Sequence, residues 1–215
     1  MEKNQLGILV PAYNESKNLQ LLIPNLKKLG KLLVVNDGST DRTTQVLKQR
    51  KCLAINFRKN RGYEKAIIAG LQYFKKSNVQ YVLTFDADGQ HQFKDIVKIK
   101  KYLQNSVTDL YIFNRFQKNR FSENILNFIF KLKFNLQDPI SGMKAYNISS
   151  LKKINLNTVK NKLLVDLTYF FLKKNYKIKN ILVYTKKRSD KPRIGPSWRV
   201  NIKILYIALY FLLKG

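Results

Sequence analysis

The sequence predicts an α/β fold in which a mostly parallel central sheet is flanked by helices. The chain has 215 residues, the length of a single domain, and 45% of them are hydrophobic, which is enough for a packed core. Apolar runs of strand length alternate with helical patterns in the first half, as in βαβ units. These strands are apolar on both faces, which is typical of a parallel sheet covered by helices.

The first half of the chain carries four predicted strands with three predicted helices between them. The strands are expected at residues 6–11, 31–37, 52–57 and 80–86. The helices are expected at residues 16–30, 40–50 and 62–77. We expect Pro24 to bend or break the first helix, because proline lacks the backbone N–H that a helix interior uses. Ser39, Thr40 or Asp41 can provide the N-cap of the second helix.

After residue 93 the alternation becomes less regular. The apolar spacing predicts helices at residues 95–104, 123–134 and 161–176, and strands at 108–113, 142–147 and 177–185. The chain contains no internal repeat and no low-complexity linker, so we expect a single domain. The tail holds an apolar run at residues 204–213, about half the length that a membrane-spanning helix needs.

The charge of the chain predicts an anionic partner. The formal net charge is +28, which favours binding to nucleic acid, a membrane surface or a phosphorylated substrate. Alternatively, the charge reflects a general bias of the composition toward lysine and has no role in binding. No C-x-x-C, RNA-recognition or homeodomain-like motif is present, so we do not expect nucleic acid as the partner. Cys52 is the single cysteine, which fits a reducing compartment, and no signal peptide is recognised.

Carboxylates follow three of the predicted strands, at the edge where open α/β sheets bind ligands. Asp86 and Asp88 project to the same side of an extended segment and could share one Mg²⁺ or Mn²⁺. Such a cation can neutralise charge that develops on a diphosphate leaving group. A turn acid followed by a helix cap is the structural alternative. Asp37 could accept hydrogen bonds from a nucleotide base or ribose, whereas Glu15 could equally cap the first helix.

Seven motifs occur in order along nearly the whole chain. They are VPAYNE (10–15), VVNDGSTD (34–41), NRGYEKAIIAG (60–70), FDADGQH (85–91), FNRF (113–116), DPISGMKAY (138–146) and RIGPSWR (193–199). Together they resemble glycosyltransferase family 2, with a GT-A fold, and most closely its polyprenyl- or dolichyl-phosphate sugar transferases.

The resemblance implies a nucleotide-diphospho-sugar donor, Mg²⁺ or Mn²⁺ as cofactor, and inversion at the anomeric carbon. The nucleotide-contacting positions of the family are matched by Pro11, Tyr13, Glu15 and Asp37. The metal and diphosphate positions are matched by Asp86, Asp88 and Gln90. Arg115 matches an arginine that faces the acceptor phosphate, and Asp138 and Ser141 match a motif beside the reacting centre. Arg193 and Ser197 match a late loop that closes over the donor.

The chain departs from the family pattern at several positions. Tyr63 stands where the family often has lysine or histidine, and Gln92 and Phe93 replace a proline pair. Lys144 keeps the positive charge of a position that is usually arginine or lysine, and Arg199 could stand in for a lysine of the late loop. The Q-x-x-R-W motif of processive synthases is absent, which argues against a processive enzyme.

We therefore expect one GT-A domain over residues 1–215. Residues 1–110 would form the nucleotide-sugar half, residues 111–197 the acceptor half, and residues 198–215 an apolar C-terminal helix. The expected reaction transfers a sugar to a polyprenyl phosphate at the cytoplasmic face of the membrane, where the protein is attached peripherally to anionic lipid. Arg115 is the residue expected to position the acceptor. Other basic residues of the acceptor half could contribute, although a solvated face is the expected role of most of these lysines: Arg120, Lys131, Lys133 and Lys144.

Other functions stay open at this point. The same fold could add a sugar to a growing surface polysaccharide or lipid-linked glycan, in which case Asp138 could act as a base for a hydroxyl acceptor. A basic nucleic-acid-binding protein is a weaker alternative. A nucleotidyltransferase is weaker still, because the loop after the first strand, PAYNESKN, has no glycine. A homo-oligomer or a membrane partner protein also remains open.

Overall fold

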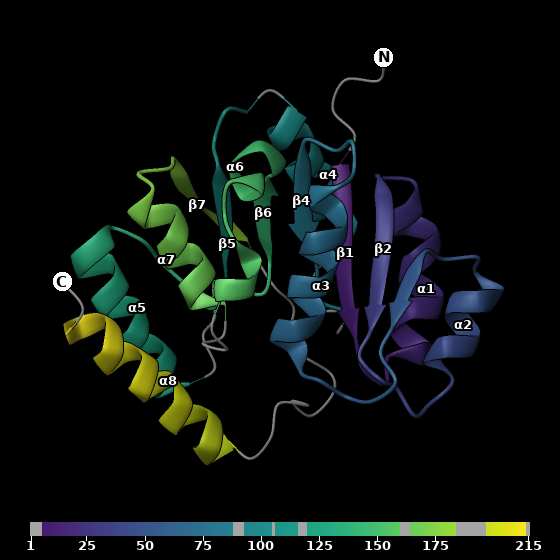
Figure 1. Ribbon diagram of the computed structural model, residues 1–215, viewed down its shortest axis with the longest axis horizontal. Helices are drawn as coiled ribbons and strands as arrows, with labels where there is room; N and C mark the ends of the chain where they lie inside the picture. Colours follow the sequence, from purple (N-terminus) through teal and green to yellow (C-terminus); the bar gives the residue numbers. More distant parts are fainter. Residues whose placement is uncertain are drawn as a thin grey trace.

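The computed structural model describes residues 6–87, 93–104, 106–115, 120–159, 164–183 and 197–213. Within these ranges a seven-stranded sheet runs through the molecule, with helices on both of its faces (Figure 1). The predicted α/β class with a mostly parallel sheet is confirmed.

The order of the elements follows the predicted alternation closely. The strands are β1 (Leu6–Ala12), β2 (Lys31–Asn36), β3 (Ala54–Asn56), β4 (Tyr81–Thr84), β5 (Leu110–Arg115), β6 (Lys144–Asn147) and β7 (Ile178–Val183). The helices are α1 (Ser16–Lys27), α2 (Thr43–Gln49), α3 (Tyr63–Lys75), α4 (Phe93–Gln104), α5 (Phe121–Phe134), α6 (Ile148–Lys152), α7 (Val165–Lys173) and α8 (Ser197–Leu213), with a 3₁₀ turn η1 (Leu156–Thr158).

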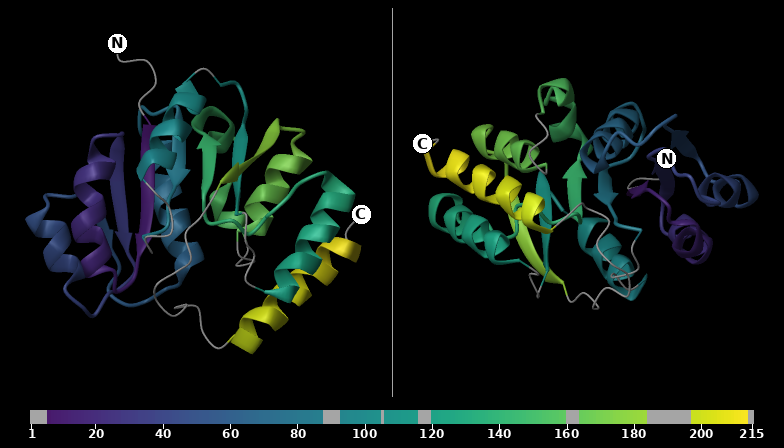
Figure 2. Two further views of the ribbon diagram at one scale, coloured as in Figure 1. Left: turned by 180° about the vertical axis from the view of Figure 1, so that it is seen from behind. Right: turned by 90° about the horizontal axis from the view of Figure 1, so that it is seen from below.

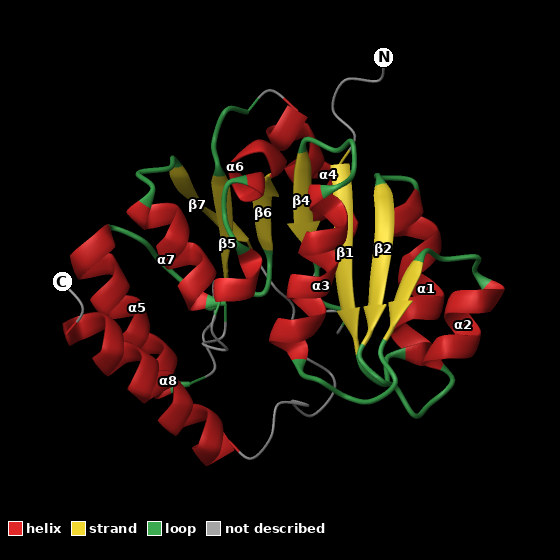
Figure 3. Cartoon of the chain, viewed as in Figure 1, coloured by secondary structure: helices red, strands yellow, loops and turns green. Residues whose placement is uncertain are grey.

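The sheet has the strand order β3-β2-β1-β4-β6-β5-β7. Strand β1 pairs in parallel with β2 and β4, β2 with β3, and β5 with β7. Strand β6 is antiparallel to both of its neighbours, β4 and β5. The arrowheads of β1 and β2 point to the lower edge of the sheet (Figure 3). Because β6 runs the opposite way, its first residue lies at the edge where the neighbouring strands end.

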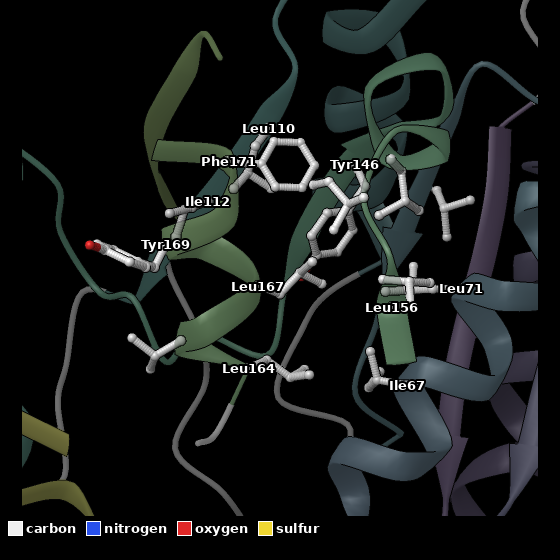
Figure 4. Close-up of a cluster of buried hydrophobic side chains, with 14 of the residues drawn as sticks. Ile67, Leu71, Leu110, Ile112, Tyr146, Leu156, Leu164, Leu167, Tyr169 and Phe171 are labelled. Carbon is white, nitrogen blue, oxygen red and sulfur yellow. The ribbon is translucent and has the colours of Figure 1, made fainter. Parts of the chain in front are cut away.

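Two hydrophobic cores lie on opposite faces of the sheet. The helices that cover these two faces are seen in Figure 2. Alternate residues of β1 show the division, because Leu9 belongs to one core while Ile8 and Val10 belong to the other. Helices α1, α2 and α4 cover the face of Ile8, and α3, α5, α6, α7 and α8 supply residues to the other core. In Figure 4, Tyr146 of β6 and Phe171 of α7 belong to this second core, with Leu71 of α3 nearby.

The structure corrects two local predictions. Helix α1 continues through Pro24 and ends at Lys27, because Leu19, Ile23 and Leu26 bury one continuous face across the proline. Helix α2 begins only at Thr43 and Arg42 stands at its N-cap position, but the side chain of Asp41 accepts a hydrogen bond from the Thr43 N–H at 2.9 Å, so Asp41 does help to cap the helix. The short α6 and the turn η1 were not predicted, since both are shorter than the window over which a helical pattern can be read.

Helices α5 and α8 lie side by side (Figures 1 and 2). Ile204, Ile207 and Phe211 of α8 are buried, and Phe211 contacts Phe130 of α5 edge to face. The other side of α8 remains exposed. Its exposed large apolar residues are Trp198, Ile202, Leu205, Tyr206, Leu209, Leu212 and Leu213. Among the described residues, no helix combines the length and the hydropathy needed to cross a bilayer.

Candidate active site

The candidate site lies at the edge of the sheet where the parallel strands end. Asp37 follows β2, Asp86 follows β4, and Arg115 is the last residue of β5. The segment 138–142 precedes the antiparallel β6, so the chain reversal brings it to the same edge. The parallel pairing of β1, β2 and β4 agrees with the predicted placement of Glu15, Asp37 and Asp86 at one edge; the placement of Arg115 and of segment 138–142 there was not predicted.

Asp37 is buried and holds the beginning of α3. Its Oδ1 accepts a hydrogen bond from the backbone N–H of Arg61 at 2.7 Å, and its Oδ2 accepts one from that of Gly62 at 2.9 Å. Gly62 has φ +97°, a conformation that residues with a Cβ rarely adopt. The carboxylate thus has a structural role that the sequence did not reveal, in addition to the nucleotide contact expected of it.

The loop between β1 and α1 is tied to the loop between β2 and α2. Asn14, at φ +56°, accepts a hydrogen bond from the Thr40 N–H at 2.8 Å and donates its own N–H to Ser39. Glu15 is buried, and its Oε2 accepts a hydrogen bond from Asn18 at 2.7 Å. Glu15 stands at the N-cap position of α1 but makes no side-chain bond to the helix backbone. Of the other two predicted nucleotide contacts, Pro11 is buried in β1 and Tyr13 is half-buried.

The carboxylate of Asp86 is held between two features of neighbouring segments. The hydroxyl of Tyr63, from the first turn of α3, donates a hydrogen bond to Asp86 Oδ1 at 3.0 Å. On its other side lies Gly142, where a Cβ would come within 2.2 Å of Asp86 Oδ2. A side chain at position 142 would therefore displace the carboxylate of Asp86 from this place.

Arg115 lies beside this acid in a network of buried carboxylates. Its Nε donates to Asp138 Oδ2 at 3.1 Å and its Nη2 to Asp138 Oδ1 at 2.9 Å, the two-point geometry typical of arginine and carboxylate. Nη2 also lies 3.2 Å from Glu123 of α5. Burial opposes the charged form, but Asp138, Glu123 and Asp86 together raise the pKa of Arg115 above its usual value. The guanidinium is fixed and charged, and 21% of the side chain is exposed.

The DPISG segment is fixed by several hydrogen bonds. Asp138 has φ +48°, an uncommon conformation for a residue with a side chain, and its N–H donates to Asn127 at 2.7 Å. The hydroxyl of Ser141 donates to the carbonyl of Phe113 at 2.7 Å. Both Asp138 and Ser141 are almost completely buried, so they hold neighbouring residues of the site in place and are not themselves open to solvent.

Lys144 does not have the position expected of a residue that binds the acceptor. Its side chain is 1% exposed, and its Nζ donates to the Pro139 carbonyl at 2.6 Å. Burial lowers the pKa of Lys144 to about 7; Asp138 opposes this shift and Arg115 adds to it. Lys133 is likewise used within the protein, since its Nζ donates to the carbonyls of Phe211 and Leu212 in the last turn of α8. Lys144 is therefore enclosed by the protein, and Lys133 is engaged with the end of α8.

Several predicted site residues lie outside the described part of the chain. These are Asp88, Gln90 and Arg193, together with the side chain of Ser197, whose backbone begins α8. Among the described residues, no three His, Cys, Asp or Glu side chains are close enough together to hold a metal. Asp86 by itself fits a hard divalent cation, which takes oxygen ligands and often uses one or two carboxylates together with substrate phosphates.

Sequence reasoning missed two contributors to this site. Tyr63 was noted only as a departure from a family pattern, and Glu123 was not singled out. No local pattern indicates either role, because each contact joins two different elements of the fold. Tyr63 and Asp86 are 23 residues apart, and Glu123 of α5 is eight residues from Arg115 of β5.

Comparison with known proteins identifies the family of the chain. The model of the family described as Glycosyl transferase family 2 matches residues 7–155. An uncharacterized protein of Methanocaldococcus jannaschii is 28% identical over 222 residues, with 96% of this chain and 91% of that protein covered. The UDP-N-acetylglucosamine--dolichyl-phosphate N-acetylglucosaminyltransferase of Methanococcus voltae is 27% identical over 186 residues, with 72% of this chain and 74% of that enzyme covered.

Solved structures show the same fold at lower identity. Glucosyl-3-phosphoglycerate synthase of Mycobacterium tuberculosis, in complex with Mn²⁺, uridine diphosphate and glucosyl-3-phosphoglycerate, has a TM-score of 0.70 and 16% identity. That match covers 98% of this chain and 79% of the synthase. Since the family model spans more than half of the chain, the protein belongs to glycosyl transferase family 2 and is a glycosyltransferase with the GT-A fold.

Proposed function

We propose that the protein moves a sugar from a nucleotide-diphospho-sugar to a polyprenyl phosphate, with inversion at the anomeric carbon. Residues 1–110 would bind the donor and residues 111–197 the acceptor. The observation that carries this proposal is the Arg115 guanidinium, which two buried acids hold beside Asp86 while leaving it partly exposed. A fixed cation at this place suits an acceptor that is itself an anion.

The state of Asp138 favours a phosphate acceptor over a sugar hydroxyl. A hydroxyl needs a base, whereas a lipid phosphate is already ionised. Both carboxylate oxygens of Asp138 accept hydrogen bonds from Arg115, and the side chain is 1% exposed. A carboxylate held in this way is poorly placed to receive a proton from a substrate, so its role is to position Arg115.

In the proposed reaction, an oxygen of the acceptor phosphate attacks the anomeric carbon on the side opposite the leaving group. The bond between that carbon and the nucleoside diphosphate breaks, and its electron pair leaves with the diphosphate. Arg115 orients the attacking phosphate, and Asp37 maintains the loop before α3 that would border the nucleotide. A divalent cation at Asp86 and Asp88 would supply charge neutralisation for the diphosphate.

An apolar surface beside the site agrees with a lipid as the acceptor. We define the α5–α8 surface as the exposed apolar residues Phe121, Phe128 and Leu132 of α5 together with those of α8 given above. Apolar side chains on paired amphipathic helices, on a chain of net charge +28, favour attachment to anionic lipid. The relatives whose names include dolichyl or dolichol phosphate also support a lipid acceptor. We propose a peripheral location at the cytoplasmic face of the membrane.

The proposal is tested by a donor and acceptor screen. The full chain is incubated with a panel of UDP- and GDP-sugars and Mn²⁺, and nucleotide release is measured with and without polyprenyl phosphate. We expect release with one donor that depends on both the lipid phosphate and the metal. Transfer to an oligosaccharide but not to polyprenyl phosphate would favour the glycan-acceptor alternative. Full activity in excess EDTA would show that the reaction needs no divalent cation.

The role of Arg115 is tested by comparing two variants. Arg115→Ala removes the guanidinium, whereas Asp138→Asn keeps it but weakens the hydrogen bonds that hold it in place. For a phosphate acceptor we expect Arg115→Ala to lose more single-turnover activity than Asp138→Asn. The reverse order would assign Asp138 the role of a base and point to a hydroxyl acceptor. Thermal unfolding of both variants separates these effects from loss of fold.

A further inference from the structure

Tyr63 makes a direct contact with the acid of the donor site, although no step of the proposed reaction involves it. Its hydroxyl lies 3.0 Å from Asp86 Oδ1, and the two residues come from different elements, the first turn of α3 and the end of β4. The geometry places the hydroxyl as donor and the carboxylate as acceptor. Such a bond fixes the rotation of a carboxylate that would otherwise turn about its side-chain torsions.

The backbone that presents Tyr63 is held from two sides. Asp37 accepts hydrogen bonds from the N–H groups of Arg61 and Gly62, the two residues before the tyrosine. The next residue, Glu64, forms an ion pair with Lys203 of α8 at 2.8 Å. Tyr63 therefore projects from a turn that both the β2 end and α8 keep in place, so its hydroxyl can define the position of another group.

The second oxygen of Asp86 is restrained by shape. It lies against Gly142, where even one added carbon would come within 2.2 Å. The carboxylate is thus seated between a hydrogen-bond donor and a close backbone, with little freedom to rotate. A hydroxyl is also a neutral donor, so it orients the carboxylate without cancelling the negative charge that a cation would need.

We propose that Tyr63 is a positioning residue that orients Asp86 for a divalent cation bound together with a nucleoside diphosphate. This inference rests on the proposed function, because it assumes that Asp86 is a ligand of that cation. Residues that orient a metal ligand in this way change metal affinity by about 10–100-fold when they are replaced. The effect of Tyr63 should therefore appear in the part of nucleotide binding that depends on metal.

The test measures nucleotide affinity by calorimetry, with Mn²⁺ and separately with EDTA. The probes are UDP, GDP, CDP and dTDP, and the full-length variants are Tyr63→Phe, Asp86→Ala and Tyr73→Phe. Tyr73 is the matched control, because it lies on the same helix, near its other end, where its ring contacts Phe74 and Lys31. For Tyr63→Phe we expect the gain in affinity from Mn²⁺ to shrink about tenfold, with unchanged affinity in EDTA. Tyr73→Phe should behave as the wild type.

The other outcomes of this experiment distinguish a failure of the Tyr63 role from a failure of the proposed function. If Asp86→Ala loses the Mn²⁺-dependent gain while Tyr63→Phe keeps it, the role of Tyr63 is overturned and the proposed metal site stands. If Asp86→Ala keeps the gain, or the wild type binds none of the four nucleotides, the proposed function itself fails at this site. If Tyr63→Phe loses affinity equally with and without Mn²⁺, or loses its fold, the tyrosine is structural and the positioning role is wrong.

Discussion

The buried ammonium of Lys144 should make the stability of the protein depend on pH in a characteristic way. Lys144 is almost fully buried, and its described hydrogen-bond partner at Nζ is the Pro139 carbonyl. Burial lowers its pKa from 10.5 to about 7, which corresponds to a cost of about 5 kcal/mol for keeping it charged in the folded state. Below pH 7 the lysine is protonated in both the folded and the unfolded states, so the full cost is present.

The cost should disappear as the pH rises. Between the folded pKa of about 7 and the unfolded value of 10.5, the unfolded chain binds the proton that the folded protein has released. The free energy of unfolding then rises with pH by about 1.4 kcal/mol per pH unit at most. From pH 7.5 to 9.5 we expect a gain of about 2–3 kcal/mol from this residue alone.

The assay compares urea unfolding of the wild type, Lys144→Met and Lys152→Met at several pH values between 6 and 9.5. Methionine has a similar length without the charge, and Lys152 is an exposed lysine that serves as the control. The unfolding free energy of the wild type minus that of Lys144→Met should rise by about 2–3 kcal/mol over the stated interval. The same difference calculated with Lys152→Met should stay flat. Parallel pH curves for the wild type and Lys144→Met would refute the reasoning.

Three further predictions follow from other contacts. Gly142→Ala places a carbon 2.2 Å from the expected position of Asp86 Oδ2, so we expect a folded protein with strongly reduced Mn²⁺-dependent turnover; unchanged turnover would contradict the close approach. Asp37→Ala leaves the part-buried backbone amides of Arg61 and Gly62 without their carboxylate and should cost roughly 1–3 kcal/mol in urea unfolding, with faster hydrogen exchange at those amides; unaltered exchange would refute the role assigned to Asp37. On α8, replacing three exposed apolar residues with serine should weaken binding to anionic vesicles by about tenfold or more in sedimentation, whereas serine at the exposed Leu21 and Val107 should not; equal binding would exclude α8 as the anchor. The three residues are Ile202, Tyr206 and Leu209.

The sequence by itself determined the class of fold and the edge at which the site lies. Strand β1 is apolar on both faces and α3 has a clear helical spacing, and these local patterns persist whatever the tertiary partners are. The carboxylates Asp37 and Asp86 follow strands, and parallel strands bring their ends together, so the convergence of the two acids could be predicted. The family could also be recognised, because its motifs are short and linear.

Only the tertiary structure decided what these side chains contact. Lys144 is a charged residue in a motif and looks available for an anionic acceptor, yet the antiparallel β6 places it in the interior, where it bonds to Pro139. Asp138 resembles a base in sequence, but the end of β5 brings Arg115 against both of its oxygens. The partners of a buried polar group are set by chain reversals and packing between distant segments, and no local pattern of residues encodes them.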